Sequence, residues 1–430
     1  MKHLRILPLF LSLLLLLPLL IPSAAAATPP SVTGVDAVYV MNLEYGQAVF
    51  AQNESKRLYP ASTAKLVTAL VAEKHFAEDL DQKIEITEEM KAAFRGRALG
   101  LTVGERITVE ALLHAMLVGG YNDAAIVLAF ATAGDLASFC AKMNECALAL
   151  GATETHYTNP TGLHDPAMVT TARDTAYIAV ELMKHETLYA ITKKPKCVLS
   201  ATNKSDERTV YSRNSLISSI LEEDYYYSYA DGIHAGSTDE GGDCVVTSGR
   251  LDGLSYVCVV LGGRSSDGKN AAFPAASNAL RYALKTFTVK TLKTKKAEVA
   301  TLPVLYSATV AEVAVHPKED LTALLPSDFD LDDVVFETSL AVTELEAPFE
   351  SGTVVGRILA RDKNAKILAA TDLIVTETVD AHGFLLFMAR LKGFVLSPVF
   401  FILLAIVAAL ILGSVYYDKK HPRRRRRFWR

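Results

Sequence analysis

The sequence predicts an α+β domain, followed by a small all-β sandwich domain and a C-terminal transmembrane helix. Within residues 28–289, a stretch with helical periodicity has strand-like segments on both sides of it. Short alternating segments separated by turn residues then occupy residues 297–379. Finally, residues 394–417 are almost wholly apolar, which is long enough to cross a hydrocarbon core of ~30 Å at ~1.5 Å per residue.

The first domain is expected to place its earliest and latest strands in one antiparallel sheet, around a helical middle. A strand–turn–strand is predicted at residues 35–51, and paired strands at 244–249 and 254–261. Helices are predicted at 62–75, 108–116, 123–132, 137–150 and 271–287.

Both ends of the chain carry targeting features. Residues 1–27 begin with Lys2 and Arg5, continue with an apolar run and end in small residues, which is the order of a cleaved signal peptide. An uncleaved anchor helix is the alternative. At the other end, residues 418–430 form a basic tail directly after the apolar run, which predicts a cytoplasmic tail. Its arginines would suit nucleic acid, but the neighbouring membrane helix argues against that role.

The charge of the exported part also argues against nucleic-acid binding. The whole chain has a formal charge of −4. Without the two basic residues of the leader, and without the eight basic and one acidic residues of the tail, this charge becomes −13. A domain this acidic is a poor ligand for nucleic acids and other polyanions.

Five cysteines lie in the exported part, and their odd number leaves at least one thiol without an intramolecular partner. Their spacing fits no zinc site, and no His-Glu-x-x-His motif occurs, so no metal is expected. Cys244 and Cys258 flank a predicted hairpin. They either form a cross-strand disulfide or are small core residues.

The first candidate for chemistry is the pair Ser62 and Lys65. A serine and a lysine three residues apart on a helix lie on one face. A lysine that is desolvated loses its charge more easily and can then deprotonate the neighbouring hydroxyl, which makes the serine a nucleophile. By itself this spacing is common and equally describes a helix cap followed by a surface lysine.

The surroundings of Ser62 add a family resemblance. The preceding strand–turn–strand and the segment Tyr59-Pro60-Ala61-Ser62-Thr63-Ala64-Lys65 resemble the start of D-alanyl-D-alanine carboxypeptidases, low-molecular-mass penicillin-binding proteins of peptidase family S11. The resemblance covers residues 35–287 and extends more loosely to residue 379. It implies a serine β-lactamase/D,D-peptidase-like catalytic domain.

Two further family motifs are present in altered form. Where relatives have Ser-x-Asn, this sequence has Gly120-Tyr121-Asn122, and Lys-Thr-Gly is replaced by His234-Ala235-Gly236. The resemblance implies a catalytic role for Asn122 beside Ser62 and Lys65. It assigns substrate binding to His234, Gly236 and Ser237: His234 to the C-terminal carboxylate, Gly236 to close backbone approach, and the Ser237 N–H to an oxyanion hole shared with Ser62.

The implied activity is removal of the terminal D-alanine from peptidoglycan stem pentapeptides through an acyl-enzyme, without a cofactor. The implied partners are these stem peptides, β-lactam antibiotics and the bacterial cell membrane, with the catalytic domain outside the cytoplasm. In the altered third motif, Ala235 has no donor for the substrate carboxylate. Losing one hydrogen bond to such a charged group lowers a rate by about 10- to 100-fold, which weakens an enzyme without abolishing it. A catalytically degenerate peptidoglycan- or partner-binding homologue, a D,D-endopeptidase and a weak β-lactamase remain alternatives.

Overall fold

The computed structural model describes residues 29–220, 223–264 and 268–420. Two compact units are present: the first reaches Thr288 and also includes Leu324–Asp328, and the second comprises Val289–Ala323 and the chain from Phe329 onward. The predicted signal peptide, and the tail beyond residue 420, lie outside the described residues.

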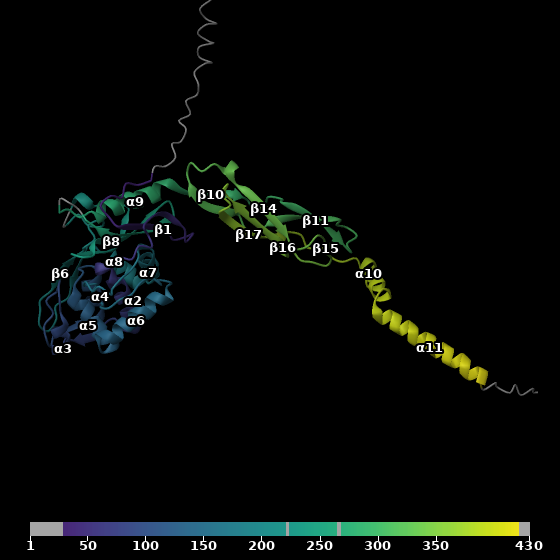
Figure 1. Cartoon of the computed structure of the whole chain (residues 1–430), viewed down its shortest axis with the longest axis horizontal. Helices are drawn as coiled ribbons and strands as arrows, with labels where there is room; N and C mark the ends of the chain where they lie inside the picture. Colours follow the sequence, from purple (N-terminus) through teal and green to yellow (C-terminus); the bar gives the residue numbers. More distant parts are fainter. Residues whose placement is uncertain (1–28, 221–222, 265–267, 421–430) are drawn as a thin grey trace, which may run out of the picture. The chain divides into compact units, whose positions relative to one another are not determined.

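A five-stranded antiparallel sheet organises the first unit, with strand order β2-β1-β9-β8-β7. Figure 1 labels two of its strands, β1 and β8. The earliest strand pairs with one of the latest, since Val38 lies opposite Val260, and this confirms the predicted antiparallel arrangement. The strands are β1 (Ala37–Asn42), β2 (Ala48–Gln52), β7 (Ala230–Thr238), β8 (Gly242–Leu251) and β9 (Leu254–Gly263).

Helices cover both faces of this sheet. On one face, α9 (Ala272–Thr286) packs its alanine-rich side against the sheet. On the other face, a larger core contains residues of the remaining helices. These are α2 (Lys65–His75), α3 (Glu88–Ala93), α4 (Val109–Leu117), α5 (Asn122–Ala133), α6 (Leu136–Ala149), α7 (Ala172–Lys184) and α8 (Glu186–Thr192). The five predicted helices are confirmed, whereas α3, α7 and α8 were not predicted.

The first unit also contains two small two-stranded antiparallel sheets. One joins β3 (Lys83–Glu85) to β4 (Arg106–Thr108), and the other joins β5 (Lys196–Leu199) to β6 (Arg208–Tyr211). The side chain of Thr108 caps α4 by accepting from Ala111 N, so β4 leads directly into that helix.

The two cysteines of the β8–β9 hairpin lie on opposite faces of the sheet, so the cross-strand disulfide is wrong. Leu251 pairs with Leu254 around a two-residue turn, and in this register each even-numbered residue lies opposite an odd-numbered one. Positions 244 and 258 are both even, so the two cysteines are not cross-strand partners. Cys258 accordingly lies opposite Thr247, in the core beneath α9, while Cys244 faces the larger helical core. All five cysteines are free thiols.

The second unit is an all-β domain followed by two helices. Six strands form one sheet in the order β14-β16-β17-β12-β11-β15, with a core of aliphatic side chains that includes Val315, Ile358 and Leu373. They are β11 (Ala300–Leu305), β12 (Glu312–Pro317), β14 (Val335–Leu340), β15 (Leu345–Glu346), β16 (Val354–Arg361) and β17 (Ile367–Val375). A separate two-stranded sheet pairs β10 (Phe287–Lys293) with β13 (Leu321–Pro326).

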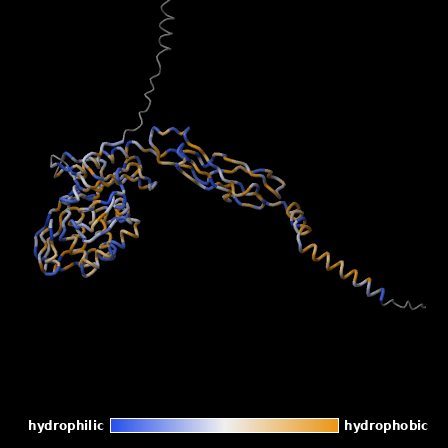
Figure 2. Tube along the Cα trace, in the orientation of Figure 1, coloured by the Kyte–Doolittle hydropathy of each residue, from blue (hydrophilic) through white to orange (hydrophobic). Residues whose placement is uncertain are grey.

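After the β domain come α10 (Gly383–Val395) and α11 (Pro398–Lys420). Pro398 starts a new helix because it lacks the N–H that would continue the preceding one. Phe394 and Val395, which the sequence grouped with the spanning segment, therefore belong to α10. Among the described helices, α11 is by itself long and apolar enough over Pro398–Tyr417 to cross a membrane, and Figure 2 shows this continuous hydrophobic stretch.

Candidate active site

The predicted nucleophile and base are adjacent in the structure. Ser62 lies in a short 3-10 helix (Ala61–Ala64), and Lys65 is the first residue of α2. The Lys65 Nζ atom is 3.2 Å from the Ser62 Oγ atom and donates to the Thr161 carbonyl oxygen at 2.6 Å. Lys65 is completely buried and Ser62 is partly exposed, so the amine lies behind the hydroxyl as seen from solvent.

This burial decides the charge of Lys65. Desolvation disfavours the ammonium form and, with a smaller contribution from the positive charge of Arg97, lowers the pKa of Lys65 to about 7. About half of the amine is then neutral at neutral pH, and a neutral amine can accept the proton of the Ser62 hydroxyl. The pair therefore has the geometry and the charge state of a nucleophile with its general base.

The loop at residues 159–163 supports the turn that carries Ser62. Ala61 has φ +46°, an unusual value for a residue with a side chain, and Gly162 packs directly on it. A Cβ atom on Gly162 would lie 1.7 Å from the Ala61 carbonyl oxygen. The Asn159 side chain holds this loop by accepting from the backbone N–H groups of Thr161 and Gly162. Sequence reasoning missed the contribution of Thr161, because its carbonyl reaches Lys65 only in the folded chain.

Asn122 is buried at the start of α5, where its polar groups hold a neighbouring loop. Its Nδ2 atom donates to the Arg95 carbonyl at 3.0 Å, and its backbone N–H donates to the Arg97 carbonyl at 2.7 Å. The adjacent Asp123 carboxylate accepts from the backbone N–H groups of Leu99, Gly100 and Leu101 in this loop, and from that of Ala124. Asn122 lines the cavity at Ser62, and it also fixes the loop of residues 94–101 beside that cavity.

Strand β7 forms the opposite wall of the cavity. Gly236 lies directly against the nucleophile: a Cβ atom there would be 2.4 Å from Ser62 Cβ and 2.6 Å from Ser62 Oγ. Ser237 also lines the cavity and is exposed. The structure thus brings Gly236 and Ser237 together with Ser62, Lys65 and Asn122.

His234 has a different environment. Its ring is only 1% exposed and does not line the cavity. The Nδ1 atom bonds the Leu117 carbonyl oxygen at 2.8 Å, while Nε2 is buried without a partner in the described residues. Burial, with the nearby positive charge of Lys65, lowers the pKa of His234 to about 3, although the bond to Leu117 acts in the other direction. The ring is neutral, and it bridges β7 to the end of α4.

The cavity has a volume of about 140 Å³ and contains two cationic side chains that sequence reasoning missed, Arg97 and Arg213. Its lining consists of Ser62, Arg97, Gly120, Asn122, Thr161, Gly162, Leu163, Arg213, Ala235, Gly236, Ser237 and Thr238. Over the described part of the chain, no three His, Cys, Asp or Glu residues are grouped in a way that could hold a metal ion.

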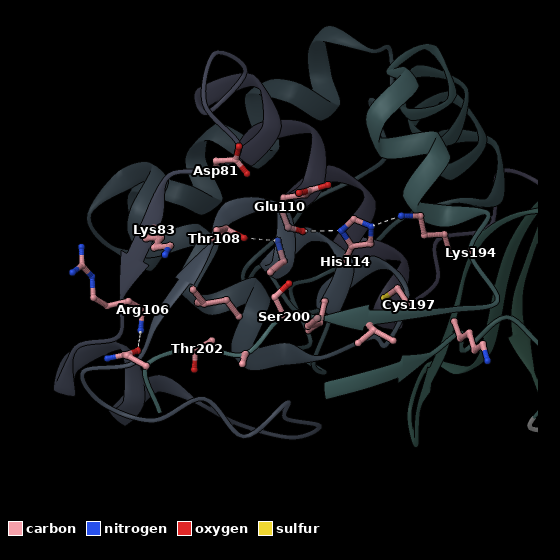
Figure 3. Close-up of a pocket in the computed structure, with 17 residues that line it drawn as sticks. Asp81, Lys83, Arg106, Thr108, Glu110, His114, Lys194, Cys197, Ser200 and Thr202 are labelled. Atoms are coloured by element: carbon pink, nitrogen blue, oxygen red, sulfur yellow. Dashed lines mark hydrogen bonds between the residues drawn. The ribbon is translucent and has the colours of Figure 1, made fainter. Parts of the chain in front are cut away.

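A larger groove of about 1050 Å³ lies along α4, β5 and the segment that follows β5. Lys194 donates to His114 at 2.9 Å within it, and the other His114 nitrogen bonds the Glu110 carbonyl (Figure 3). Figure 3 also shows that Arg106 and Lys194 lie at opposite ends of this groove. Its basic side chains do not converge on one point, and Ser62 is not part of its lining.

Two family models match this chain. The family model for D-alanyl-D-alanine carboxypeptidase matches residues 23–265, and the model for the C-terminal domain of penicillin-binding protein 5 matches residues 287–381. The D-alanyl-D-alanine carboxypeptidase DacF of Bacillus subtilis is 26% identical over 354 residues, which are 81% of this chain and 86% of DacF. The carboxypeptidase DacC of Escherichia coli is 28% identical over 380 residues, covering 84% of this chain and 89% of DacC.

Among solved structures, penicillin-binding protein 5 of Haemophilus influenzae has a similar fold. The TM-score is 0.63 at 22% identity, over 82% of this chain and 99% of the other. The first family model alone covers more than half of the sequence. The chain therefore belongs to the D-alanyl-D-alanine carboxypeptidase family and is a serine peptidase of the low-molecular-mass penicillin-binding protein class.

Proposed function

We propose that this chain trims peptidoglycan by removing the terminal D-alanine of stem pentapeptides, with Ser62 as the nucleophile. The observation that carries the proposal is the buried Lys65 amine, which lies 3.2 Å from the Ser62 hydroxyl and has a pKa of about 7. A serine beside a neutral amine is equipped for acyl transfer, and the family performs this reaction on D-alanyl-D-alanine termini.

In the proposed first step, Ser62 Oγ attacks the carbonyl carbon between the two terminal D-alanines while Lys65 accepts the hydroxyl proton. The C–N bond then breaks. Lys65 returns the proton to the leaving amine, directly or through water, because Gly120 provides no hydroxyl to relay it. Water next attacks the ester carbonyl while Lys65 takes a proton from it. The C–O bond to Ser62 then breaks, Lys65 returns the proton to Ser62 Oγ, and the shortened peptide leaves.

Four residues at the site are assigned to orientation and charge stabilisation. The backbone N–H groups of Ser62 and Ser237 are proposed to bind the oxyanion that forms on the attacked carbonyl. Gly236 lets the substrate backbone approach the strand closely, since it has no side chain. Asn122 is assigned to holding the substrate and the loop of residues 94–101, a role supported by its bonds to the Arg95 and Arg97 carbonyls.

For the cellular arrangement, we infer that α11 anchors the chain in the bacterial cell membrane, with the catalytic unit outside the cytoplasm and the basic tail inside. Support comes from the apolar span Pro398–Tyr417 and from the lysines and arginines that follow it in sequence. The stem peptides of peptidoglycan, which lie outside the cytoplasm, would then be accessible to Ser62.

The test is labelling of the full chain in detergent with a fluorescent penicillin, next to Ser62→Ala and to Ser200→Ala as a matched control. We expect the native chain and Ser200→Ala to be labelled and Ser62→Ala to be unlabelled. An impermeant form of the probe should also label intact cells if the catalytic unit is outside.

Absence of labelling in a folded native chain across pH 5–8 would reject the acyl-enzyme and favour a binding protein on a degenerate site. Where labelling succeeds, product analysis distinguishes the remaining alternatives. Release of D-alanine from linear pentapeptides supports the carboxypeptidase, while cleavage restricted to cross-linked muropeptides supports a D,D-endopeptidase.

The charge state of Lys65 predicts a specific pH dependence. Only the neutral amine can act as the base, and burial and Arg97 hold its pKa at about 7. The acylation rate should fall about tenfold per pH unit below 7 and level off above it, which gives roughly a 50-fold difference between pH 5 and pH 7. His234 is neutral over this range and should add no inflection near 6.5. Stopped-flow acylation rates measure the profile, and a flat profile from pH 5 to 8 would contradict the role of Lys65.

A further inference from the structure

The wall of the cavity formed by β7 lacks a cation for the substrate. If the proposed function is correct, the substrate ends in a carboxylate, which a positive group should bind. His234 is neutral and does not line the cavity, and the Ala235 side chain has no donor. The positive side chains that line the cavity are Arg97 and Arg213.

Arg97 is held in place by three contacts that leave its fork of terminal nitrogens available. Its Nε atom donates to the Gly119 carbonyl at 2.8 Å, and its guanidinium lies 4.8 Å from the centre of the Tyr121 ring. Its carbonyl accepts from the backbone N–H of Asn122. Within the described ranges, no acceptor of the chain bonds its two Nη groups. An exposed arginine fixed in this way loses little conformational entropy when it binds a carboxylate.

Gly119 and Gly120, which precede Tyr121, leave space for the side chains around Arg97. A Cβ atom on Gly119 would come within 2.4 Å of the Tyr121 ring, on which the Arg97 guanidinium rests. Gly120 has φ +69°, and a Cβ atom there would lie 3.3 Å from Arg213 Cγ. The absence of side chains at positions 119 and 120 thus leaves room for the Tyr121 ring and for the Arg213 stem.

The positive charge of Arg97 is felt inside the site. After burial, it is the contribution that lowers the pKa of Lys65. A charge close enough to act on Lys65, which is 3.2 Å from Ser62 Oγ, is also close to the space that a bound substrate would occupy.

We propose that Arg97 binds the C-terminal carboxylate of the substrate and supplies, from the loop of residues 94–101, the cation that β7 lacks. Arg97 is then a specificity-determining residue for the proposed reaction. It makes the enzyme prefer a peptide that ends in a free carboxylate over one whose end is uncharged.

The experiment compares two N-acylated tripeptides that end in D-Ala-D-Ala, one as the free acid and one as the C-terminal amide. The full chain in detergent is assayed as native, Arg97→Gln and Arg97→Lys. Arg106→Gln, which removes an equal charge from the other groove, is the matched control. We expect Arg97→Gln to lower kcat/KM for the acid by 10- to 100-fold and for the amide by less than about threefold. Arg97→Lys should fall between native and Gln, and Arg106→Gln should match the native chain.

Equal losses on both peptides would mean a structural role for Arg97 and would overturn the proposal. The proposal is equally overturned if Arg97→Gln keeps the native preference for the acid while Arg213→Gln loses it. If the native chain turns over neither peptide, the proposed function fails, and Arg97 is then tested by calorimetric binding to the Ser62→Ala chain. If the Ser62→Ala chain binds the acid more tightly than the amide, and adding Arg97→Gln removes this difference, the proposed role of Arg97 is supported. Equal binding of the two peptides, or no binding of either, rejects that role.

Discussion

Replacing Lys65 with methionine is expected to lower the rate of penicillin acylation by about 10²- to 10⁴-fold, the usual contribution of a general base. Methionine has nearly the volume of lysine and suits a completely buried position, so the fold should survive. The Ser62 hydroxyl, 3.2 Å from Nζ in the native chain, would then have no base beside it. Acylation rates of the native and variant chains, measured with the same penicillin, give the ratio directly.

Thermal unfolding provides the control for this variant. The Thr161 carbonyl oxygen loses the donor that binds it at 2.6 Å, which costs about 1–3 kcal/mol of stability. The removal of a buried amine offsets part of this cost. A folded Lys65→Met chain that acylates within tenfold of the native rate would show that another group activates Ser62.

Replacing Gly236 with alanine is expected to reduce acylation by at least about 100-fold. The new Cβ atom would lie 2.4 Å from Ser62 Cβ and 2.6 Å from Ser62 Oγ, so either the serine or the strand must move. A displacement of about 1 Å at a nucleophile costs on the order of 10²-fold in rate. Labelling time courses with fluorescent penicillin measure this loss.

A double-mutant cycle assigns this effect to the contact itself. Gly236→Ala should destabilise the native chain by about 1–3 kcal/mol, as overpacking does, and should cost much less in a Ser62→Gly background, where Cβ and Oγ are absent. Equal destabilisation in both backgrounds would place the strain elsewhere along β7. The rate loss would then not report contact with the nucleophile.

The elements predicted best from the sequence are those whose pattern is local. The helical patterns after Ser62 and over residues 108–116 are visible in the chain itself and gave helices within a few residues of those observed. Helix α7 also has a local start signal, since Thr171 accepts from the N–H of Asp174, yet it was not among the predicted helices. Its helical character was visible and was not used.

The parts of the site that were missed depend on contacts between distant segments. No spacing rule indicates that the Thr161 carbonyl reaches Lys65, or that Arg97 lies beside Gly119. The orientation of His234 was hidden for the same reason. A side chain on a strand can point to either face of the sheet. The packing of β7 against α4 directs the His234 ring toward the Leu117 carbonyl and away from the cavity. The family resemblance located strand β7 correctly, but it did not indicate where the side chain of His234, the first residue of the motif, points.

The pairing of β1 with β9 has a consequence for how the chain is made. Val38 leaves the ribosome long before Val260, its partner in the sheet. At synthesis rates of about 5–20 residues per second, β9 follows β1 by roughly 10–40 s. During this interval the centre of the sheet cannot close, because β1 has only its short neighbour β2 to pair with. The pairing of β1 is therefore complete only after almost the whole first unit has been synthesised, so the central sheet forms late in the production of the chain.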